Sequence, residues 1–232
     1  MVLKKFFMTG GSGTLGREML ENQHDYKIEF TSPSSTDCDV RNYEDIYEKV
    51  KNSDCCTVVH CAAMTDVKEI ELDAILACDI NVVGTLNIIK VCQELNKKLV
   101  FISTDYVFDG KKGNYKTDDP INPISKYAKT KAAAELMVSS FENHLIIRTS
   151  FFDKHFPYDK ALADQFSTKD YIDVIAPMIL NKIRKNLFGT IHVGTDRSST
   201  YEKALRRKPS VEKIYLKDLD FKIPEDVSLF IG

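Results

Sequence analysis

The sequence predicts an α/β fold, built on a doubly wound parallel sheet with a small C-terminal lobe. Apolar runs of strand length alternate with longer segments of helical period, which is the pattern of repeated βαβ units. Some runs, such as Leu-Val-Phe-Ile at 99–102, are apolar at every position, as in strands buried on both faces. A glycine-rich turn follows the first run, as expected where a first strand leads into a first helix.

The elements can be placed in order along the chain. The expected strands are 5–9, 27–31, 57–61, 98–103, 145–148 and 190–193. The expected helices are 16–22, 43–51, 73–95, 125–142 and 169–185. Residues 105–125 are rich in Asp, Gly, Lys and Pro, and therefore predict a long loop.

The domain organisation follows from where this alternation weakens, after about residue 150. The prolines that interrupt it are Pro157, Pro177, Pro209 and Pro224. We expect residues 1–150 to form the main domain, with 165–195 adding a helix and the last strand. Residues 151–164 and 196–232 would then form a small substrate-binding lobe.

Composition excludes several classes of protein. The 232 residues suit one α/β domain with a small appendage, and 43% hydrophobic with 28% charged residues is ordinary globular usage. A net charge of -2 gives no basic field for nucleic acid or a membrane surface. Six cysteines without C-x-x-C spacing, and no signal-like segment before the first strand, predict a cytoplasmic protein with reduced and mostly buried thiols, including Cys55 and Cys56. The five histidines show no metal-binding spacing, so no metal is expected.

The glycine turn itself predicts a dinucleotide site. Gly10, Gly13 and Gly16 follow a strand and open a helix, where backbone N–H groups and the positive helix end can hold a pyrophosphate. Thr14 and Leu15 belong to the same turn. This position in the first βα unit favours a Rossmann-like fold over a turn without a ligand.

The tip of the second strand predicts the choice of cofactor. NAD sites place an acidic residue there, to bind the adenosine ribose. Here the residues at 32–35 are Ser-Pro-Ser-Ser, and Ser32, Ser34 or Arg17 would accommodate a 2′-phosphate. We therefore expect NADPH and leave NADH open.

Tyr127 and Lys131 are the best candidates for chemistry. Four residues apart on a helix, they lie on one face. The ammonium group is expected to lower the tyrosine pKa from about 10 toward the working pH, so that the phenol can protonate a carbonyl under reduction. The alternative is a surface aromatic–cation pair of little energetic weight.

Together these motifs resemble the extended short-chain dehydrogenases/reductases. The glycine turn, Asp39-Val40, His60-Cys61-Ala62-Ala63, Asn81, the string Ser-Thr-Asp-Tyr-Val-Phe-Asp-Gly at 103–110 and Tyr127-x-x-x-Lys131 occur in that superfamily's order. The 103–110 string, followed by Asp-Asp-Pro-Ile-Asn-Pro at 118–123, is similar to the dTDP-4-dehydrorhamnose reductase group. The resemblance is dense from residue 5 to about 151 and sparse afterwards.

The resemblance implies a role for each matching residue. Thr104 would bond the substrate carbonyl, Tyr127 would donate the proton, and Lys131 would tune Tyr127 and hold the nicotinamide ribose. The other cofactor positions would be Asp39 and Val40 beside the adenine, Cys61, Ala62 and Ala63 along the cofactor, and Asn81. The substrate positions would be Thr65, Val67, Thr104, Asp105, Tyr106 and Phe151, the last standing where relatives often carry Trp.

The activity implied by the resemblance is NAD(P)H-dependent reduction of a nucleotide-linked 4-keto-6-deoxysugar. Many relatives dimerise through two helices, which makes a homodimer one expectation. A second interpretation is a bifunctional 3,5-epimerase/4-reductase, although Asp105 and Tyr106 stand where some epimerising relatives carry a cysteine. A third is a non-catalytic NADP-binding regulatory subunit, like the β subunit of methionine adenosyltransferase. The short C-terminal half, ending in Ile-Pro-Glu-Asp-Val-Ser-Leu at 223–229, motivates it.

Overall fold

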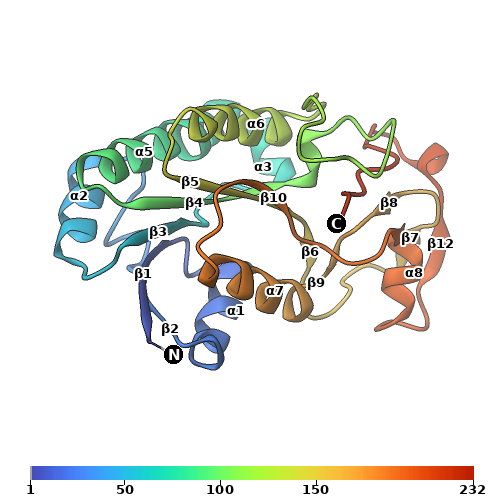
Figure 1. Cartoon of the computed structure of the whole chain (residues 1–232). Coiled ribbons are helices and arrows are strands. Elements are labelled where there is room, and N and C mark those ends of the chain that lie inside the picture. The colour runs from blue at the N-terminus through green and yellow to red at the C-terminus, as the bar shows by residue number, and fades with distance from the viewer. Residues whose placement is uncertain (1) are drawn as a thin grey trace.

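A six-stranded parallel sheet forms the centre of the molecule (Figure 1). The structure, a computed structural model, describes residues 2–232. The strands lie in the order β10-β5-β4-β3-β1-β2. Their bounds are β1 (Lys4–Thr9), β2 (Ile28–Thr31), β3 (Thr57–His60), β4 (Lys98–Thr104), β5 (His144–Thr149) and β10 (Gly189–His192). All six predicted strands are present, and the predicted α/β fold is confirmed.

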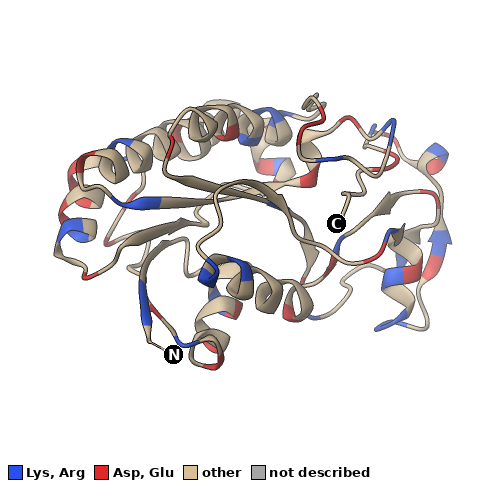
Figure 2. Cartoon of the chain, viewed as in Figure 1, with Lys and Arg blue, Asp and Glu red and all other residues tan. Residues whose placement is uncertain are grey.

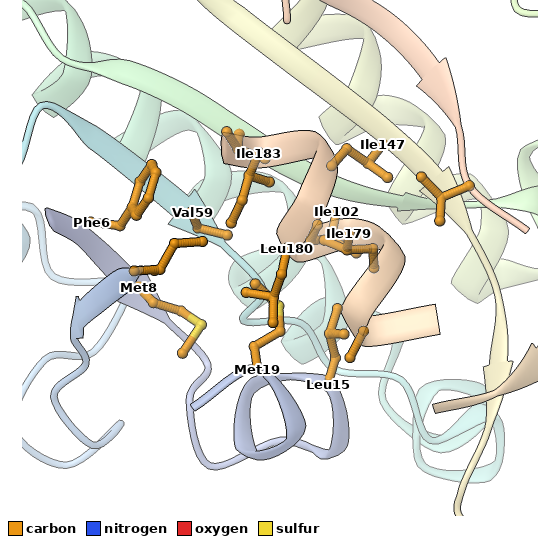
Figure 3. Close-up of a cluster of buried hydrophobic side chains, with 14 of the residues drawn as sticks. Phe6, Met8, Leu15, Met19, Val59, Ile102, Ile147, Ile179, Leu180 and Ile183 are labelled. Carbon is orange, nitrogen blue, oxygen red and sulfur yellow. The ribbon is translucent and has the colours of Figure 1, made fainter. Parts of the chain in front are cut away.

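Helices cover both faces of this sheet (Figure 1). One face carries α2 (Tyr43–Asn52), α5 (Gly84–Glu94) and α6 (Lys126–Ser139), and the other carries α1 (Thr14–Asn22) and α7 (Ile172–Arg184). Figure 3 shows the hydrophobic core between the sheet and the helices α1 and α7. There, Met8 from β1, Met19 from α1 and Leu180 from α7 point toward one another. Burial of apolar side chains on each face supplies most of the driving force for the fold.

The predicted helix 73–95 is present but irregular. It consists of α4 (Ala74–Cys78), a π-helical turn (Asp79–Val83) and α5. Before it lies α3 (Val67–Leu72), which the sequence did not predict, because six residues are too few to establish a helical period. Asp66 caps α3 by accepting from the backbone N–H groups of residues 68 and 69. The π-helical turn is the kind of irregularity often found at functional sites.

Pro177 lies inside α7, so the expectation that this proline interrupts the pattern is wrong. The helix continues through it because its apolar face is buried against the sheet, with Ile175, Ile179 and Ile183 almost fully enclosed. The free energy gained by this burial outweighs two costs of the proline. One is the lost backbone hydrogen bond, worth about 1 kcal/mol, and the other is the clash of the ring with the preceding turn.

The order in which strands are added to the sheet reverses between β1 and β3. From β1 the chain first adds β2 on one side, and then crosses to add β3 on the other. In open parallel sheets, ligands bind outside the carboxyl ends of the strands at such a switch point. The glycine turn lies at the carboxyl end of β1.

A small lobe extends from the carboxyl ends of β5 and β10 (Figure 1). It contains three short strand pairs and one helix. These are β6 (Phe151–Phe152) with β9 (Asp170–Tyr171), β7 (Lys160–Leu162) with β12 (Glu212–Ile214), β8 (Phe166–Ser167) with β11 (Ser198–Ser199), and α8 (Thr200–Leu205). Between β9 and β11 the chain returns to the main sheet as α7 and β10.

The C-terminal segment joins the lobe to the long loop 105–125. Tyr115 exchanges backbone hydrogen bonds with this segment, its N–H donating to Ser228 at 2.8 Å and its C=O accepting from Phe230 at 2.7 Å. Phe166 in β8 is bonded to the same segment, from its N–H to the C=O of Glu225 at 2.7 Å. The Pro-containing stretch at 223–229 is therefore a strap between two parts of the molecule.

Acidic and basic residues are interspersed along the helices, without a face of one sign in the view of Figure 2. One helix, Ala74–Glu94, is long and apolar enough to cross a membrane, but half of its apolar window is buried in the protein, as in a core helix. Cys55 is buried as expected. Cys56 is exposed, so the expectation that it is buried is wrong.

Candidate active site

The turn after β1 accepts only glycine at two of its positions. Gly10 has φ of +75°, and a Cβ there would lie 2.5 Å from the backbone nitrogen of Ala62. A Cβ on Gly16 would lie 2.5 Å from the Cα of Gly11. These two glycines let the turn approach the end of β3 and let α1 start close beneath the turn.

The start of α1 leaves backbone donors available. Gly13 is the N-cap residue, and no side chain caps the helix. The N–H of Gly13 is bonded to the C=O of Gly10 at 3.0 Å, which fixes the turn. The N–H groups at Thr14 and Leu15 have no intrahelical partner, because the first turn of any helix lacks acceptors for them. Such a helix start is suited to bind an anionic group.

The tip of β2 carries no carboxylate, in agreement with the sequence. Ser32 donates from its hydroxyl to the C=O of Met8 at 3.0 Å and packs against the glycine turn. Further on, Asp39 forms a bidentate ion pair with Arg41, with 2.6 Å between Oδ2 and Nη2. This guanidinium lowers the pKa of Asp39. Val40 is buried against Gly84.

The end of β3 lies opposite the glycine turn. Cys61, Ala62 and Ala63 are half-buried there, and the N–H of Cys61 bonds to the C=O of Thr9 at 3.2 Å. His60 is buried between the Thr9 hydroxyl at 2.7 Å and the Thr85 hydroxyl at 3.0 Å.

His60 links β1, β3 and α5 beside the predicted cofactor residues. Burial lowers its pKa to about 3, so the ring is neutral, and nearby Lys131 acts in the same direction. Apart from its place at the end of a strand and in the motif His60-Cys61-Ala62-Ala63, nothing in the sequence predicts this role.

Asn81 connects the neighbouring loop to α6. Its amide oxygen accepts from the N–H of Met64 at 2.7 Å, and its amide nitrogen donates to the C=O of Met64 at 3.0 Å and to the Thr130 hydroxyl at 2.9 Å. The side chain is almost fully buried in the π-helical turn. It holds the segment after β3 against the helix that carries Tyr127 and Lys131.

Thr104 ends β4, and Asp105 follows it in a short 3-10 turn. The Thr104 hydroxyl donates to Asp105 Oδ1 at 3.1 Å and accepts from the N–H of Tyr106 at 3.2 Å. Burial raises the pKa of Asp105 to about 6, whereas Lys169 and the hydroxyls of Thr104 and Ser150 act in the opposite direction. A buried carboxyl group therefore lies beside the threonine.

Tyr127 lies in the first turn of α6, which Ser125 caps by accepting from the N–H of Ala128 at 3.1 Å. The sequence predicted that Lys131 would lower the pKa of Tyr127, and the structure gives the opposite direction. Burial raises this pKa first, and the negative charge of Asp105 raises it further, while the Thr104 hydroxyl acts the other way. The phenol is thus held in its protonated form.

Lys131 is almost fully buried one turn further along α6. Its ammonium group donates to the C=O of Ile102 at 2.8 Å and lies 4.1 Å from the ring centroid of Phe101. Burial lowers the pKa of Lys131 to about 8, against the opposing influence of Cys61 and Glu135. Both of these contacts are with residues of β4.

Glu135 and Arg148 lie behind these residues and form an ion pair. The sequence analysis did not predict this pair. Arg148 Nη2 lies 2.6 Å from Glu135 Oε1, and both side chains are almost fully buried. The other carboxylate oxygen of Glu135 accepts from the Ser103 hydroxyl. The stripe of Tyr127, Lys131 and Glu135 at spacing four was the signal that could have found this glutamate.

Two buried polar atoms at this edge of the sheet have no hydrogen-bond partner. Within residues 2–232, three buried side-chain atoms are without a partner, and two of them are Asp105 Oδ2 and Thr149 Oγ1. Thr149 ends β5 directly opposite Thr104 in the sheet register. Since an unpaired buried polar atom costs free energy, their gathering beside Thr104 indicates a place for a polar ligand.

The remaining predicted substrate residues differ in exposure. Thr65 and Val67 are exposed after β3, while Tyr106 and Phe151 are half-buried. Across the part of the chain that the structure describes, no group of three or more His, Cys, Asp or Glu side chains is placed to hold a metal ion. The arrangement offers a phenol, a threonine hydroxyl and a carboxyl group beside a helix start and glycine turn.

Comparison with known proteins identifies the family. The model of the RmlD substrate binding domain matches residues 4–176. The chain belongs to this RmlD family. The dTDP-4-dehydrorhamnose reductase of Aggregatibacter actinomycetemcomitans is 29% identical over 182 residues, which are 76% of this chain and 62% of that relative. Methionine adenosyltransferase 2 subunit beta of Mus musculus is 31% identical over 151 residues, 61% of this chain and 44% of that protein.

The solved structures of RmlD relatives show the same fold. The crystal structure of dTDP-4-dehydrorhamnose reductase from Bacillus anthracis, in complex with NADP, is 26% identical with a TM-score of 0.87, and covers 99% of this chain and 90% of that chain. The sequence matches are shorter: this chain spans less than two thirds of the length of the curated relatives named above. The resemblance to the dTDP-4-dehydrorhamnose reductase group is confirmed.

Proposed function

We propose that this protein is an NADPH-dependent reductase of a nucleotide-linked 4-keto-6-deoxysugar. The observation that carries the proposal is the meeting of Thr104, Asp105 and Tyr127 at the carboxyl edge of the sheet, beside the turn of Gly10–Gly16 in space. Membership of the RmlD family supports it. The NADP in the Bacillus anthracis relative supports the choice of cofactor.

The residues present fit a dinucleotide. The free N–H groups at the start of α1 suit the pyrophosphate, and a Cβ at Gly10 or Gly16 would close the turn against its own neighbours. Ser32 and Arg17 donate to backbone carbonyl groups, of Met8 and Ser12, and would be the residues beside a 2′-phosphate at the β2 tip. Ser34 is less suited, because its hydroxyl donates to the Asp37 carboxylate at 2.6 Å. Asp39 and Val40 would border the adenine, and 61–63 with Asn81 and Lys131 would border the nicotinamide side.

The proposed roles in the reaction follow from the protonation states. When bound, the reduced nicotinamide supplies a hydride to the ketone carbon. Tyr127, whose raised pKa keeps the phenol protonated, gives its proton to the developing alkoxide oxygen. Thr104 donates a hydrogen bond to the same oxygen. Lys131 stays positively charged at neutral pH and stabilises the tyrosinate once the proton has left.

The substrate would lie between the sheet edge and the lobe. We assign its sugar ring to Thr65, Val67, Asp105, Tyr106 and Phe151. The lobe of 151–164 and 196–232 would cover the nucleotide. The 90% structural coverage of the Bacillus anthracis chain supports a lobe large enough for this task.

A second candidate is a regulatory subunit that keeps the fold without turnover. The similarity to methionine adenosyltransferase 2 subunit beta favours it. The two candidates differ in chemistry, because a regulatory subunit needs neither a protonated phenol nor an aligned hydroxyl.

One experiment separates them. The purified protein is incubated with NADPH and, separately, with dTDP-, UDP- and GDP-linked 4-keto-6-deoxysugars, while absorbance loss and product stereochemistry are followed. We expect NADPH oxidation with at least one sugar nucleotide. Solvent deuterium at C3 or C5 of the product would identify a bifunctional epimerase/reductase. No oxidation with any of the sugars, together with a stable protein partner in a pull-down, would contradict the reductase and favour the regulatory subunit.

A further inference from the structure

Lys169 lies in the tight turn between β8 and β9, at the side of the lobe that faces the site. Its ammonium nitrogen lies 4.7 Å from the ring centroid of Phe152 and 5.8 Å from that of Tyr106. The side chain is half-buried. Among residues 2–232, no carboxylate or hydrogen-bond acceptor is paired with this ammonium group, unlike the neighbouring lysine Lys203. It is a donor group without an acceptor.

The turn that carries Lys169 is held rigidly. Its neighbour Asp170 is buried, and accepts from the Thr195 hydroxyl at 2.9 Å and from Arg206 at 3.1 Å. The fully buried ammonium group of Lys203 lies 3.4 Å from the same carboxylate. This network anchors the turn at Asp170, next to the residue that carries the lysine side chain. Such a support is what a binding residue needs and a solvated surface lysine does not.

Asp105 faces this lysine from the sheet side. Its Oδ2 atom is buried without a partner, and its Oδ1 atom accepts from Thr104. The charge of Lys169 acts on Asp105 from close enough to favour the carboxylate form, and is the largest influence after burial. An acceptor and a donor without hydrogen-bond partners therefore lie at the same edge of the site, and the ring centroids of Tyr106 and Phe152 lie 5.8 and 4.7 Å from the ammonium nitrogen.

This combination selects one chemical class of ligand. A hydroxyl group donates one hydrogen bond and accepts others, so neighbouring hydroxyls on a ring can pair with a carboxylate and an ammonium group together. A phosphate group accepts only, and a carboxylate beside it would repel it. The apolar faces of two aromatic rings suit the C–H faces of a sugar ring better than a charged group.

We propose that Lys169 is a further substrate-binding residue, which donates to a hydroxyl of the sugar ring while Asp105 Oδ2 accepts from an adjacent hydroxyl. The inference rests on the proposed function and names the part of the substrate that this edge of the site recognises. A sugar ring with one hydroxyl beside the reacting ketone, at C3, and a second on the next carbon, C2, would be bound in one orientation by the pair. The pair therefore contributes to substrate affinity and selectivity, and Tyr127 and Thr104 to the chemical step.

The test uses the full-length protein and two variants of this residue. Lys169→Met removes the charge at similar length, and Lys169→Arg keeps it. Lys51→Met is the matched control, because Lys51 also lies over an aromatic ring, 5.4 Å from the centroid of Tyr47, but on α2, outside the proposed site. KM and kcat are measured with NADPH and the dTDP-linked 4-keto-6-deoxysugar, and the NADPH Kd is measured by fluorescence.

We expect Lys169→Met to raise KM for the sugar nucleotide roughly 10- to 100-fold, the scale of a hydrogen bond to a charged group. The NADPH Kd and the melting temperature should stay unchanged, and Lys169→Arg should recover part of the loss. Lys51→Met should match the wild type. A KM for Lys169→Met within about twofold of the wild type, in an active preparation, would overturn the inference alone.

A double-mutant cycle adds a second readout. Asp105→Asn and Lys169→Met should each weaken substrate affinity, and the double variant should lose less than the product of the two effects, because the residues bind one ligand together. Independent, multiplicative losses would contradict the pairing. A wild-type protein that neither oxidises NADPH with any of the sugar nucleotides nor binds them in calorimetry would overturn the proposed function, and this inference with it.

Discussion

Glu135 accepts two hydrogen bonds from Arg148, at 2.6 and 3.0 Å, in an ion pair that is almost fully buried behind the site. Glu135 lies one turn beyond Lys131 on α6, and Arg148 lies next to Thr149 on β5. Arg148 also donates to the C=O of Thr117 in the long loop at 3.1 Å. One ion pair thus joins the helix of Tyr127 to the sheet and to the loop over it.

Removing one partner of this pair should destabilise the protein strongly. Arg148→Met leaves a buried carboxylate without its cation, and should lower the free energy of unfolding by about 3 to 5 kcal/mol in urea denaturation. The double variant Glu135→Gln/Arg148→Met should be more stable than Arg148→Met alone. The control is Asp54→Asn, which breaks the exposed ion pair with Lys5 at 2.9 Å and should cost less than about 1 kcal/mol. Additive losses in the double variant would contradict the coupling.

Asp105 should make stability fall with rising pH. Its pKa is about 6 in the folded protein and 3.8 as its ordinary value, so between these values the folded state binds more protons than the unfolded chain. The free energy of unfolding therefore decreases as pH rises through this range. Above about pH 6, where Asp105 is ionised, the loss of stability has reached its full size.

Replacing this carboxyl group tests the assignment. Asp105→Asn should raise the free energy of unfolding by about 2 to 3 kcal/mol at pH 8, and by far less near pH 4, while lowering turnover. Denaturant titrations at the two pH values measure the difference. An equal effect at both would show that ionisation of this group does not govern the change.

Tyr127→Phe should separate chemistry from binding. The variant lacks only the phenolic hydroxyl, so NADPH should bind as before, while turnover should fall at least about 10²-fold, the scale of general acid catalysis. The NADPH Kd and kcat are measured on the same preparation. Unchanged turnover with a verified substrate would contradict the role of Tyr127 as proton donor.

Turnover should also fall on the alkaline side. With a pKa of about 8, Lys131 loses its charge at a pH where the raised pKa of Tyr127 keeps the phenol protonated. The groups facing this ammonium, His60 and Cys61 from β3 and Glu135 from α6, include only one opposing negative charge. We expect kcat/KM to decrease roughly tenfold per pH unit above about pH 8. Lys131→Arg, slower overall, should show no such decline.

Gly10→Ala should abolish cofactor binding. The new Cβ adds strain at φ of +75° and lies 2.5 Å from the backbone nitrogen of Ala62, so the turn must move away from β3. Gly189→Ala is the control, since Gly189 has φ of +77° but no atom within 4 Å of a new Cβ. It should cost about 1 to 2 kcal/mol of stability and leave the NADPH Kd unchanged. Equal NADPH affinity in both variants would contradict the close approach.

The sequence by itself determined the sheet, the glycine turn and the stripe of Tyr127 and Lys131, because these depend on local spacing. Strands and helices follow the period of apolar residues, and a glycine turn is specified by a few neighbouring positions. The helix that contains Pro177 was predicted, although the proline itself was expected to interrupt the pattern, and α3 was missed because it is too short to show a period.

Only the tertiary structure decided the electrostatics of the site and the support behind it. The pKa of Tyr127 is raised because burial and Asp105 outweigh any neighbour on its own helix, which spacing alone does not reveal. Glu135 and Arg148 are 13 residues apart, and Lys169 is 64 positions from Asp105 (169 − 105), so folding is what brings each pair together. A pKa depends on solvent exclusion and on charges through space, and both arise when distant segments pack.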